Sequence, residues 1–235
     1  MKSLKRYTAK GVHEKVIECM KGFGRGTILD APSGQGALSK DLDALGFKLF
    51  LGDIRRENIL YRNGRCIQFD LNKFFPFKDG AFDYVICVEG IEHIENPHHL
   101  INVFARLVRQ DGYLVITTPN VMTIKSRLKF LFYSYLDFFK DFDPLPLGEK
   151  NKMEADYQQH INPIFYAEMK FILEKYGFKI CRIETNKMTK KWRMIYPFIR
   201  WLVRNKTKKT FPMDPFFVSD TILEGQILIF VAKHL

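Results

Sequence analysis

The sequence predicts an α/β protein in which helices cover both faces of a mostly parallel, doubly wound sheet. Short apolar runs alternate with amphipathic helical segments along most of the 235 residues, and this alternation is typical of βαβ units. The run at 82–88 is apolar almost throughout, as expected for a strand that is buried on both faces. With 46% apolar residues, the chain is long enough to form one packed domain, 1–235.

The first half of the chain is expected to alternate helices and strands. Residues 12–23 place four apolar side chains on one helical face, and Gly46 ends a second helix at 37–45. Three short strands each run into an acidic residue: 27–29 before Asp30, 47–51 before Asp53, and 65–69 before Asp70.

The second half continues the same pattern after the strand at 82–88. An amphipathic helix at 97–108 is followed by a turn at Asp111-Gly112 and a strand at 113–118. Gly177 ends a further helix at 164–176. Strands at 178–183 and 226–232 are then expected to close the sheet as an antiparallel pair.

Two long segments interrupt this alternation. The segment 121–162 is rich in aromatic residues and follows the fifth strand, and the segment 187–220 lies between the last two strands. Loops of this length in a compact domain usually carry function or form lids. We therefore expect a substrate-side insertion at 121–162 and a basic amphipathic insertion at 187–220.

The net charge of +11 is concentrated in the second insertion. Residues 187–209 hold nine Lys or Arg and no acidic residue, and the rest of the chain is nearly balanced. Trp192, Ile195, Ile199 and Leu202 recur at near-helical spacing within it. Such a helix could lie on an anionic membrane, bind nucleic acid or pack as a lid. We favour the membrane over RNA because this stripe is too aliphatic for a base-stacking platform.

Composition narrows the class of protein further. The chain has no run of about 18 apolar residues, the length that a membrane span needs, and its N-terminus lacks the continuous apolar core of a secretory signal. Its four cysteines form no CxxC pair, which favours reduced, buried thiols over disulfides or metal ligation. We expect a cytoplasmic protein, at most peripheral at the inner membrane face, with no metal site.

A glycine-rich turn follows the first strand, where Asp30 leads into Ser33-Gly34-Gln35-Gly36. In open α/β sheets, ligands bind outside the carboxyl ends of the strands. Asp53 can accept both hydroxyls of a ribose, and Asp70 can accept from an adenine amino group. The chain has neither GxxxxGK[ST] nor GxGxxG. This favours a ligand with adenine and ribose but no pyrophosphate, such as S-adenosylmethionine.

Three stretches resemble the class I S-adenosylmethionine-dependent methyltransferases over roughly residues 10–120 and 160–233. They are LDAPSGQG at 29–36, where Pro32 replaces the first glycine of the family motif, AFDYVICVEGIEHIENP at 81–97, and DGYLVITTPN at 111–120. The resemblance implies a Rossmann-like, seven-stranded sheet with an antiparallel last strand. The resemblance also favours members of this family that are associated with cell-surface polysaccharides.

The resemblance implies cofactor contacts from four strand ends. Asp30, Gly34 and Gly36 would hold the methionine part, Asp53 the ribose, and Asp70 the adenine amino group, with Leu71 packed against the ring. Further cofactor contacts are expected from Ala31, Ser33 and Ile54. Glu89 would lie near the methionine end or the acceptor.

Transfer to a hydroxyl also requires removal of a proton, and the candidate catalytic residues are Glu89, His93 and His160. The chain has no [DN]PP[YF] motif after the fourth strand and no Pro-Cys pair there, which argues against adenine or glutamine nitrogen and cytosine carbon as acceptors. We therefore expect an oxygen or nitrogen of a small molecule, a saccharide or a lipid-linked glycan. An RNA methyltransferase that uses residues 187–209, and a non-catalytic cofactor-binding interaction module, stay open.

Overall fold

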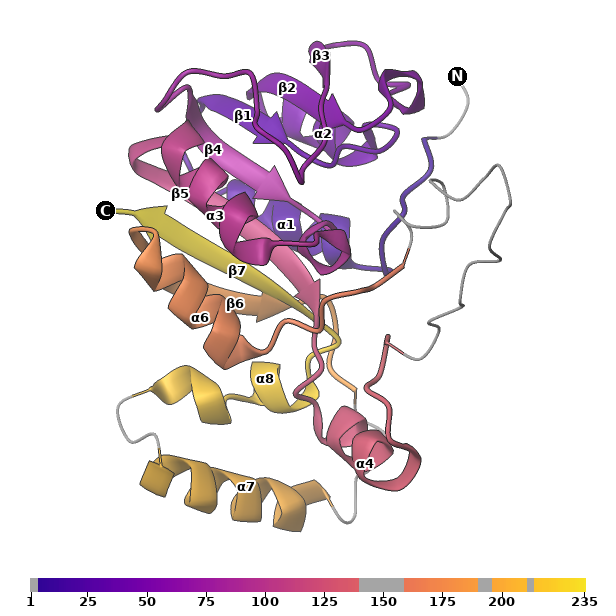
Figure 1. The fold of residues 1–235 in the computed structure, drawn as a ribbon, viewed down its shortest axis with the longest axis vertical. Coiled ribbons are helices and arrows are strands. Elements are labelled where there is room, and N and C mark those ends of the chain that lie inside the picture. Colours follow the sequence, from indigo (N-terminus) through magenta and orange to yellow (C-terminus); the bar gives the residue numbers. More distant parts are fainter. Residues whose placement is uncertain (1–3, 140–158, 190–195, 211–213) are drawn as a thin grey trace.

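The computed structural model describes residues 4–139, 159–189, 196–210 and 214–235. Seven strands form one sheet in the order β3-β2-β1-β4-β5-β7-β6 (Figure 1). The strands are β1 (Thr27–Asp30), β2 (Lys48–Asp53), β3 (Arg65–Gln68), β4 (Phe82–Cys87), β5 (Val108–Pro119), β6 (Phe178–Thr185) and β7 (Ile227–His234). Only β7 runs antiparallel to its neighbours, β5 and β6. The predicted seven-stranded α/β fold with an antiparallel last strand is confirmed.

Helices cover both faces of the sheet. Helices α1 (Val12–Met20) and α2 (Ala37–Asp43) pack on one face, and α3 (Pro97–Leu107) and α6 (Tyr166–Lys175) pack on the other. Strand β4 contributes to the hydrophobic core on each face of the sheet. Tyr84 and Ile86 pack with α1 and α2, while Val85 and Cys87 pack with α3 and α6. The apolar run at 82–88 is therefore a strand that is buried on both faces, as its composition predicts.

Two local expectations need correction. Strand β5 begins at Val108, directly after α3, and not after the Asp111-Gly112 turn. Phe82 pairs with Val108 but Tyr84 pairs with Tyr113, so the residues between them bulge out of the ladder. The four cysteines are free, as expected, but Cys181 is exposed and Cys66 only partly buried. Cys181 is exposed because it lies on β6, at the edge of the sheet.

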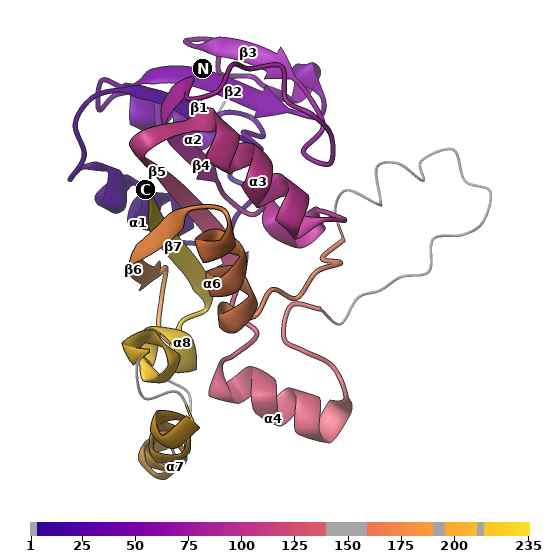
Figure 2. The ribbon, with the colours of Figure 1, turned by 60° about the vertical axis from the view of Figure 1, so that its left-hand side comes forward.

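Both insertions leave the sheet at the edge where the parallel strands end. The first insertion contains α4 (Ile124–Tyr133), and the second contains α7 (Tyr196–Thr210), η3 (Pro215–Val218) and α8 (Asp220–Glu224). Figures 1 and 2 place α4 and α7 at the same end of the molecule. Trp192 and Ile195 lie outside the described residues. No helix within the described ranges is long and apolar enough to cross a membrane.

Asn120 ties the second insertion to the end of β5. Its side-chain amide donates to the carbonyl oxygens of Thr221, Ile222 and Gly225 at 3.3, 2.9 and 2.7 Å. Its side-chain oxygen accepts from the amide of Met122 at 2.9 Å. One buried side chain thus donates to three carbonyls at the C-terminal end of α8, where backbone groups lack partners within the helix; of these, the carbonyl of Thr221 also accepts from the amide of Gly225 at 2.9 Å.

Candidate functional site

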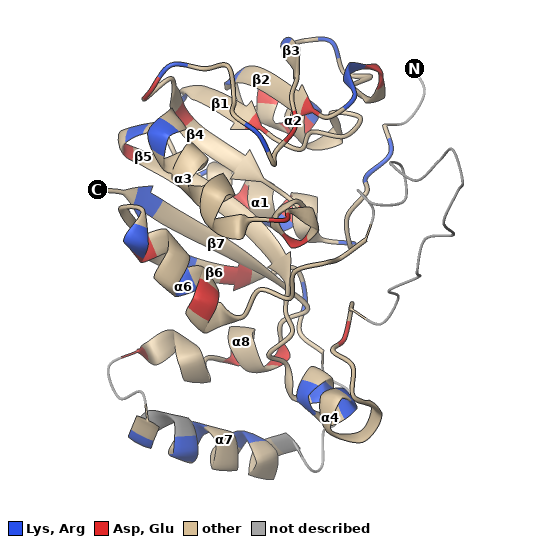
Figure 3. Ribbon diagram, viewed as in Figure 1, with Lys and Arg blue, Asp and Glu red and all other residues tan. Residues whose placement is uncertain are grey.

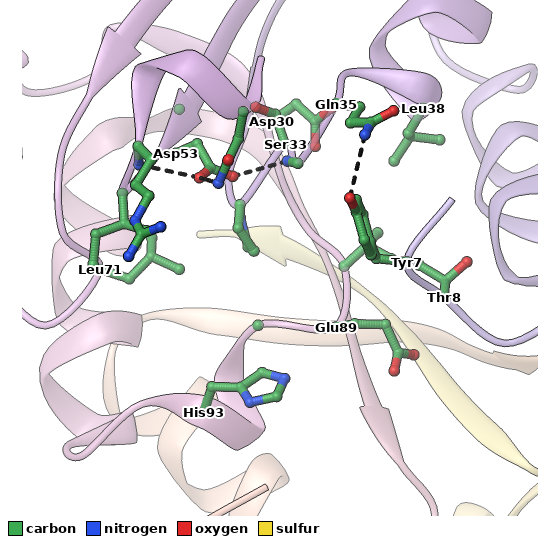
Figure 4. Close-up of a pocket in the computed structure, with 18 of the residues that line it drawn as sticks. Tyr7, Thr8, Asp30, Ser33, Gln35, Leu38, Asp53, Leu71, Glu89 and His93 are labelled. Carbon is green, nitrogen blue, oxygen red and sulfur yellow. Dashed lines mark hydrogen bonds between the residues drawn. The ribbon is translucent and has the colours of Figure 1, made fainter. Parts of the chain in front are cut away.

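A cavity of about 700 Å³ opens at the carboxyl ends of β1, β2 and β4 (Figure 4). Ten of the predicted site residues line it: Asp30, Ser33, Gly34, Asp53, Ile54, Asp70, Leu71, Glu89, His93 and His160. The other two predicted residues, Ala31 and Gly36, belong to the same turn but are not among the lining residues. The volume falls in the range typical of pockets for small ligands and cofactors.

The glycine turn is held between β1 and β2. The amide of Ser33 donates to the carbonyl of Gly52 at 2.8 Å, and the amide of Gly34 donates to Oδ2 of Asp53 at 2.9 Å. Gly34 has φ 51°, in the left-handed region, which favours glycine. A Cβ at Gly36 would come within 2.5 Å of Cβ of Tyr61. Gly36 is therefore needed for close packing at the start of α2.

Asp30 stands at the end of β1 and is almost completely buried, with 1% exposed. Burial raises the pKa of its carboxyl to about 7, although a hydrogen bond from the Ser39 hydroxyl lowers it in part. A neighbouring cation would lower this pKa again. The carboxyl of Asp30 thus suits a positively charged ligand.

Asp53 is buried at the end of β2, and its carboxylate accepts several hydrogen bonds. Besides Gly34, the amide of Arg55 and the side-chain amide of Asn58 donate to its Oδ1, each at 3.2 Å. Burial nonetheless raises the pKa of its carboxyl. Asp70 follows β3, and its Oδ1 accepts from the amide of Asn72 at 2.9 Å. Each carboxylate is therefore held in place at the end of its strand.

Glu89 lies across the cavity from Asp30 and Asp53 (Figure 4). It has φ 49°, an uncommon conformation for a residue other than glycine, and its amide donates to Oγ1 of Thr117 at 2.9 Å. Its Oε1 is buried without a hydrogen-bond partner among the described residues. Burial raises the pKa of its carboxyl to about 7.

The structure brings His93 and His160 together although they are far apart in the sequence. Their rings meet edge to face with centroids 4.9 Å apart. Nδ1 of His93 lies 2.8 Å from the carbonyl oxygen of Gln159, and Nδ1 of His160 lies 3.1 Å from that of Phe138. A carbonyl can only accept, so in both rings Nδ1 carries the hydrogen and Nε2 keeps its lone pair. Burial lowers the pKa of both imidazoles.

Residues 159–162 dock on the loop that follows β4. The amides of Ile161 and Asn162 both donate to the carbonyl oxygen of Glu92, at 2.9 and 3.0 Å. The side-chain amide of Asn162 donates to the carbonyl of Ile94. These bonds, together with the contact of His93 with Gln159, fix the position of His160.

Glu92 adjoins the lining residue His93 but is not itself among the lining residues, and the sequence analysis did not identify it. Its side chain is fully buried, with 0% exposed, and neither carboxylate oxygen has a hydrogen-bond partner in the described part of the chain. Burial raises the pKa of this carboxyl well above its usual range, and Glu89 raises it further. Ligand atoms of Glu92, His93 and His160 all lie within 4.8 Å of one another.

The segment before α1 also lines the cavity. Oε1 of Gln35 accepts from the amide of Lys5 at 2.8 Å, and Nε2 of Gln35 donates to the hydroxyl of Tyr7 at 3.2 Å. Thr8 and His13 complete this wall. No motif in the sequence marks these residues, because they reach the pocket only by folding back over the glycine turn.

The lining fits S-adenosylmethionine. Three carboxylates stand at the ends of neighbouring strands, where they can accept from the ribose hydroxyls, the adenine amino group and the cationic amino group. Leu71 offers apolar surface for the adenine ring. The raised pKa values of Asp30 and Glu89 are what a cationic ligand would reverse.

Fold and site together define a class I S-adenosylmethionine-dependent methyltransferase. The family model of the methyltransferase domain matches residues 4–183, so the chain belongs to this family, and its cofactor is S-adenosylmethionine.

Curated relatives include two ubiquinone biosynthesis O-methyltransferases. The enzyme from Thiobacillus denitrificans is 28% identical over 110 residues, which cover 46% of this chain and 45% of that enzyme. The enzyme from Glaesserella parasuis is 30% identical over 111 residues, 46% of each. The match thus spans about half the length of these relatives. A solved S-adenosylmethionine-dependent methyltransferase from Archaeoglobus fulgidus is 19% identical, with a TM-score of 0.58 over 95% of both chains, and shares the fold.

Proposed function

We propose that the protein transfers a methyl group from S-adenosylmethionine to a hydroxyl oxygen of a small-molecule, saccharide or lipid-linked acceptor. The observation that carries this proposal is the pair of neutral imidazoles, His93 and His160, at the cavity. An oxygen acceptor needs a group that takes its proton, and both rings keep Nε2 available for this. Relatives named O-methyltransferases favour oxygen over nitrogen.

The strand-end residues are proposed to hold the cofactor. Asp30, Ser33 and Gly34 hold its amino-acid end, with the backbone of Ala31 and Gly36 shaping the turn. Asp53 and Ile54 hold the ribose, and Asp70 and Leu71 hold the adenine. Glu89, on the opposite side of the cavity (Figure 4), faces the reacting end.

The bound cofactor supplies a methyl group on a sulfonium, which is a good leaving group. The protein must align the acceptor and take its proton. Burial keeps His93 neutral near pH 7 by lowering its pKa, so its Nε2 can accept the hydroxyl proton. The acceptor leaves as a methyl ether, and the imidazolium then releases the proton to water.

The class of acceptor is supported from two sides. The motif resemblance points to saccharides, whereas the curated relatives are named for ubiquinone biosynthesis. Both offer hydroxyl oxygens. Both grounds therefore support oxygen as the acceptor atom. Labelling with methyl-labelled S-adenosylmethionine would identify the acceptor molecule.

We further propose that α4 and α7 contact an anionic membrane through a basic-aromatic face. This face comprises Phe130, Leu131, Phe132 and Tyr133 of α4 and Phe198, Trp201 and Leu202 of α7, all exposed. Lys and Arg residues lie beside them on both helices (Figure 3). Phe198 and Trp201 are 61% and 57% exposed, and aromatic side chains beside cations are typical of helices that lie in the membrane interface.

The charge of this face is smaller than the sequence alone implies. Arg200 and Arg204 both form ion pairs with Asp220, whereas Lys206 and Lys209 are exposed. The proposed contact with acidic lipids therefore depends on the remaining exposed cations together with the aromatic side chains.

Methyl-labelled S-adenosylmethionine and cell extract test the proposed function. We expect label in a low-molecular-weight or lipid fraction as an ether that survives mild alkali. Label in RNA would instead support the nucleic-acid alternative. If no fraction is labelled although the protein binds S-adenosylhomocysteine, the non-catalytic module becomes the better account.

A further inference from the structure

We propose that Glu92, His93 and His160 form a binding site for a divalent transition-metal ion at the acceptor end of the cavity. The ion would bind whether or not an acceptor is present. Only its suggested role in methyl transfer rests on the proposed function.

The first observation is the unpaired carboxylate of Glu92. Its side chain is completely buried, and both of its oxygens lack a hydrogen-bond partner among the described residues. A buried charge without a partner is strongly unfavourable, so buried carboxylates are normally paired or bind a metal. Residues 91–93 form a short helical turn, which presents Glu92 beside His93. An ion between Glu92 and the two histidines would supply the missing positive charge.

The second observation is the orientation of the two imidazoles. His93 and His160 each use Nδ1 to donate to a backbone carbonyl, of Gln159 and Phe138 respectively. Histidines that ligate metals almost always donate their other nitrogen in this way, because the bond fixes both tautomer and ring orientation. The carbonyl of Glu92 also accepts from the amides of Ile161 and Asn162, so the backbone of one ligand holds the segment that carries another.

The geometry allows an ion after a small adjustment. The three ligand atoms lie within 4.8 Å of one another, whereas ligands about 2.0–2.2 Å from a tetrahedral zinc ion are roughly 3.4 Å apart. Small side-chain rotations of Glu92, His93 and His160 could close this difference. Two imidazoles and one carboxylate favour Zn²⁺ and other first-row divalent ions over Mg²⁺ or Ca²⁺, which prefer oxygen ligands.

Three protein ligands leave one position open, as in catalytic zinc sites. His93 and His160 both line the cavity, so this position is available to an acceptor hydroxyl. Coordination would lower the pKa of that hydroxyl and release its proton to water. The two imidazoles would then act as ligands, with the ion in place of a free imidazole base.

Titration of the chelator-treated 235-residue chain with Zn²⁺ and Co²⁺ tests the site without any acceptor. Calorimetry should give one ion per chain, and bound Co²⁺ should develop visible absorption. We expect Glu92→Gln and His160→Ala to weaken binding at least tenfold. His99→Ala is the matched control, because His99 is a partly buried histidine of α3 outside the lining residues. Binding of S-adenosylhomocysteine checks that each variant is folded.

Unchanged metal affinity in Glu92→Gln and His160→Ala, or an equal loss in His99→Ala, would overturn the site. So would the absence of stoichiometric binding to the parent protein. If the ion binds but chelated protein methylates at the full rate, the site stands and only its role in transfer is wrong. Failure of the proposed function would instead appear as no methyl transfer with or without the ion.

Discussion

The backbone amide of Gly34 donates a 2.9 Å hydrogen bond to Oδ2 of Asp53, which joins the glycine turn after β1 to the end of β2. Asp53 thus positions the turn in addition to its proposed role in holding the ribose. A ligand that bonds to Asp53 therefore meets a carboxylate whose position is already fixed.

Replacement of Asp53 should weaken cofactor binding more than it weakens the fold. A hydrogen bond to a charged group contributes about 1.5–3 kcal/mol, so Asp53→Ala should bind S-adenosylhomocysteine roughly tenfold or more weakly by calorimetry. Asp79→Asn, at an acid outside the cavity that pairs with Arg106, should bind as tightly as the parent. Undiminished affinity in folded Asp53→Ala would refute the ribose assignment.

Asp30→Asn should change how stability depends on pH. The pKa of Asp30 rises from 3.8 in its ordinary environment to about 7 in the folded protein, so the folded state holds a proton that the unfolded state releases. Stability contributed by this group is therefore lost as pH rises from about 4 to about 7. Asn cannot ionise, and it can still accept from Ser39.

Urea unfolding at pH 5 and pH 8 measures this effect. The stability of Asp30→Asn relative to the parent should increase between these values by up to about 3 kcal/mol, because the interval from pH 5 to the raised pKa of about 7 covers about two units at about 1.4 kcal/mol each. Parallel pH dependences of the two proteins would mean that Asp30 ionises normally in the fold.

Loss of the histidine pair should impair turnover while cofactor binding persists. His93→Ala and His160→Ala remove the proposed proton acceptor or metal ligand, and either loss should lower the rate about 10²–10⁴-fold on the true acceptor. Affinity for S-adenosylhomocysteine should stay close to that of the parent. If both variants keep full turnover, alignment alone is sufficient and neither ring takes part.

Asn120→Ala should destabilise the protein without touching the cofactor site. The substitution removes the amide that three carbonyls of the α8 region share. The carbonyl of Thr221 keeps the amide of Gly225, so the loss falls on Ile222 and Gly225, and an uncompensated buried polar group costs about 1–3 kcal/mol. We expect a loss of about 2–3 kcal/mol in urea unfolding. Asn205→Ala, at an exposed position of α7, is the control and should change stability little. An equal effect of both variants would contradict this role of Asn120.

The basic-aromatic face should bind vesicles that contain acidic lipids and release them as salt is raised. Each exposed cation near the surface adds about 1 kcal/mol, and the aromatic side chains add apolar contact. A Phe198→Ser, Trp201→Ser double variant should sediment less with such vesicles. Phe171→Ser removes an equally exposed ring from α6 (60%) and should not. Equal binding to neutral vesicles, or salt-dependent binding of RNA alone, would argue against a membrane face.

The sequence was sufficient to predict that the strand-end carboxylates line one cavity. Asp30, Asp53 and Asp70 end successive strands, and parallel strands bring their carboxyl ends to one edge of a sheet. The strand count and the antiparallel last strand followed from the family resemblance. The position of these carboxylates depends on backbone topology more than on side-chain packing. The alternation of strand and helix patterns along the sequence predicts that topology.

The acceptor half could not be predicted in the same way. Glu92 looks like any acid at the start of a helical turn, and its burial depends on residues 159–162 folding back onto the loop after β4. The contact of His93 with His160 and the wall formed by Tyr7 and His13 likewise join segments that are distant in the sequence. No local pattern encodes such contacts, because they arise only when the insertions and the N-terminal segment pack.

The position of β7 between β5 and β6 bears on how such a protein diversifies. Thr185 pairs with Leu228, so the chain that leaves β6 returns to β7 at the same point of the ladder, and β5 ends beside it. The intervening segment can be lengthened, shortened or exchanged while the register on both sides of β7 is kept. A lineage could therefore acquire a new acceptor, or a new cellular surface, by swapping these segments, and an engineer could graft one from another enzyme without redesigning the nucleoside pocket.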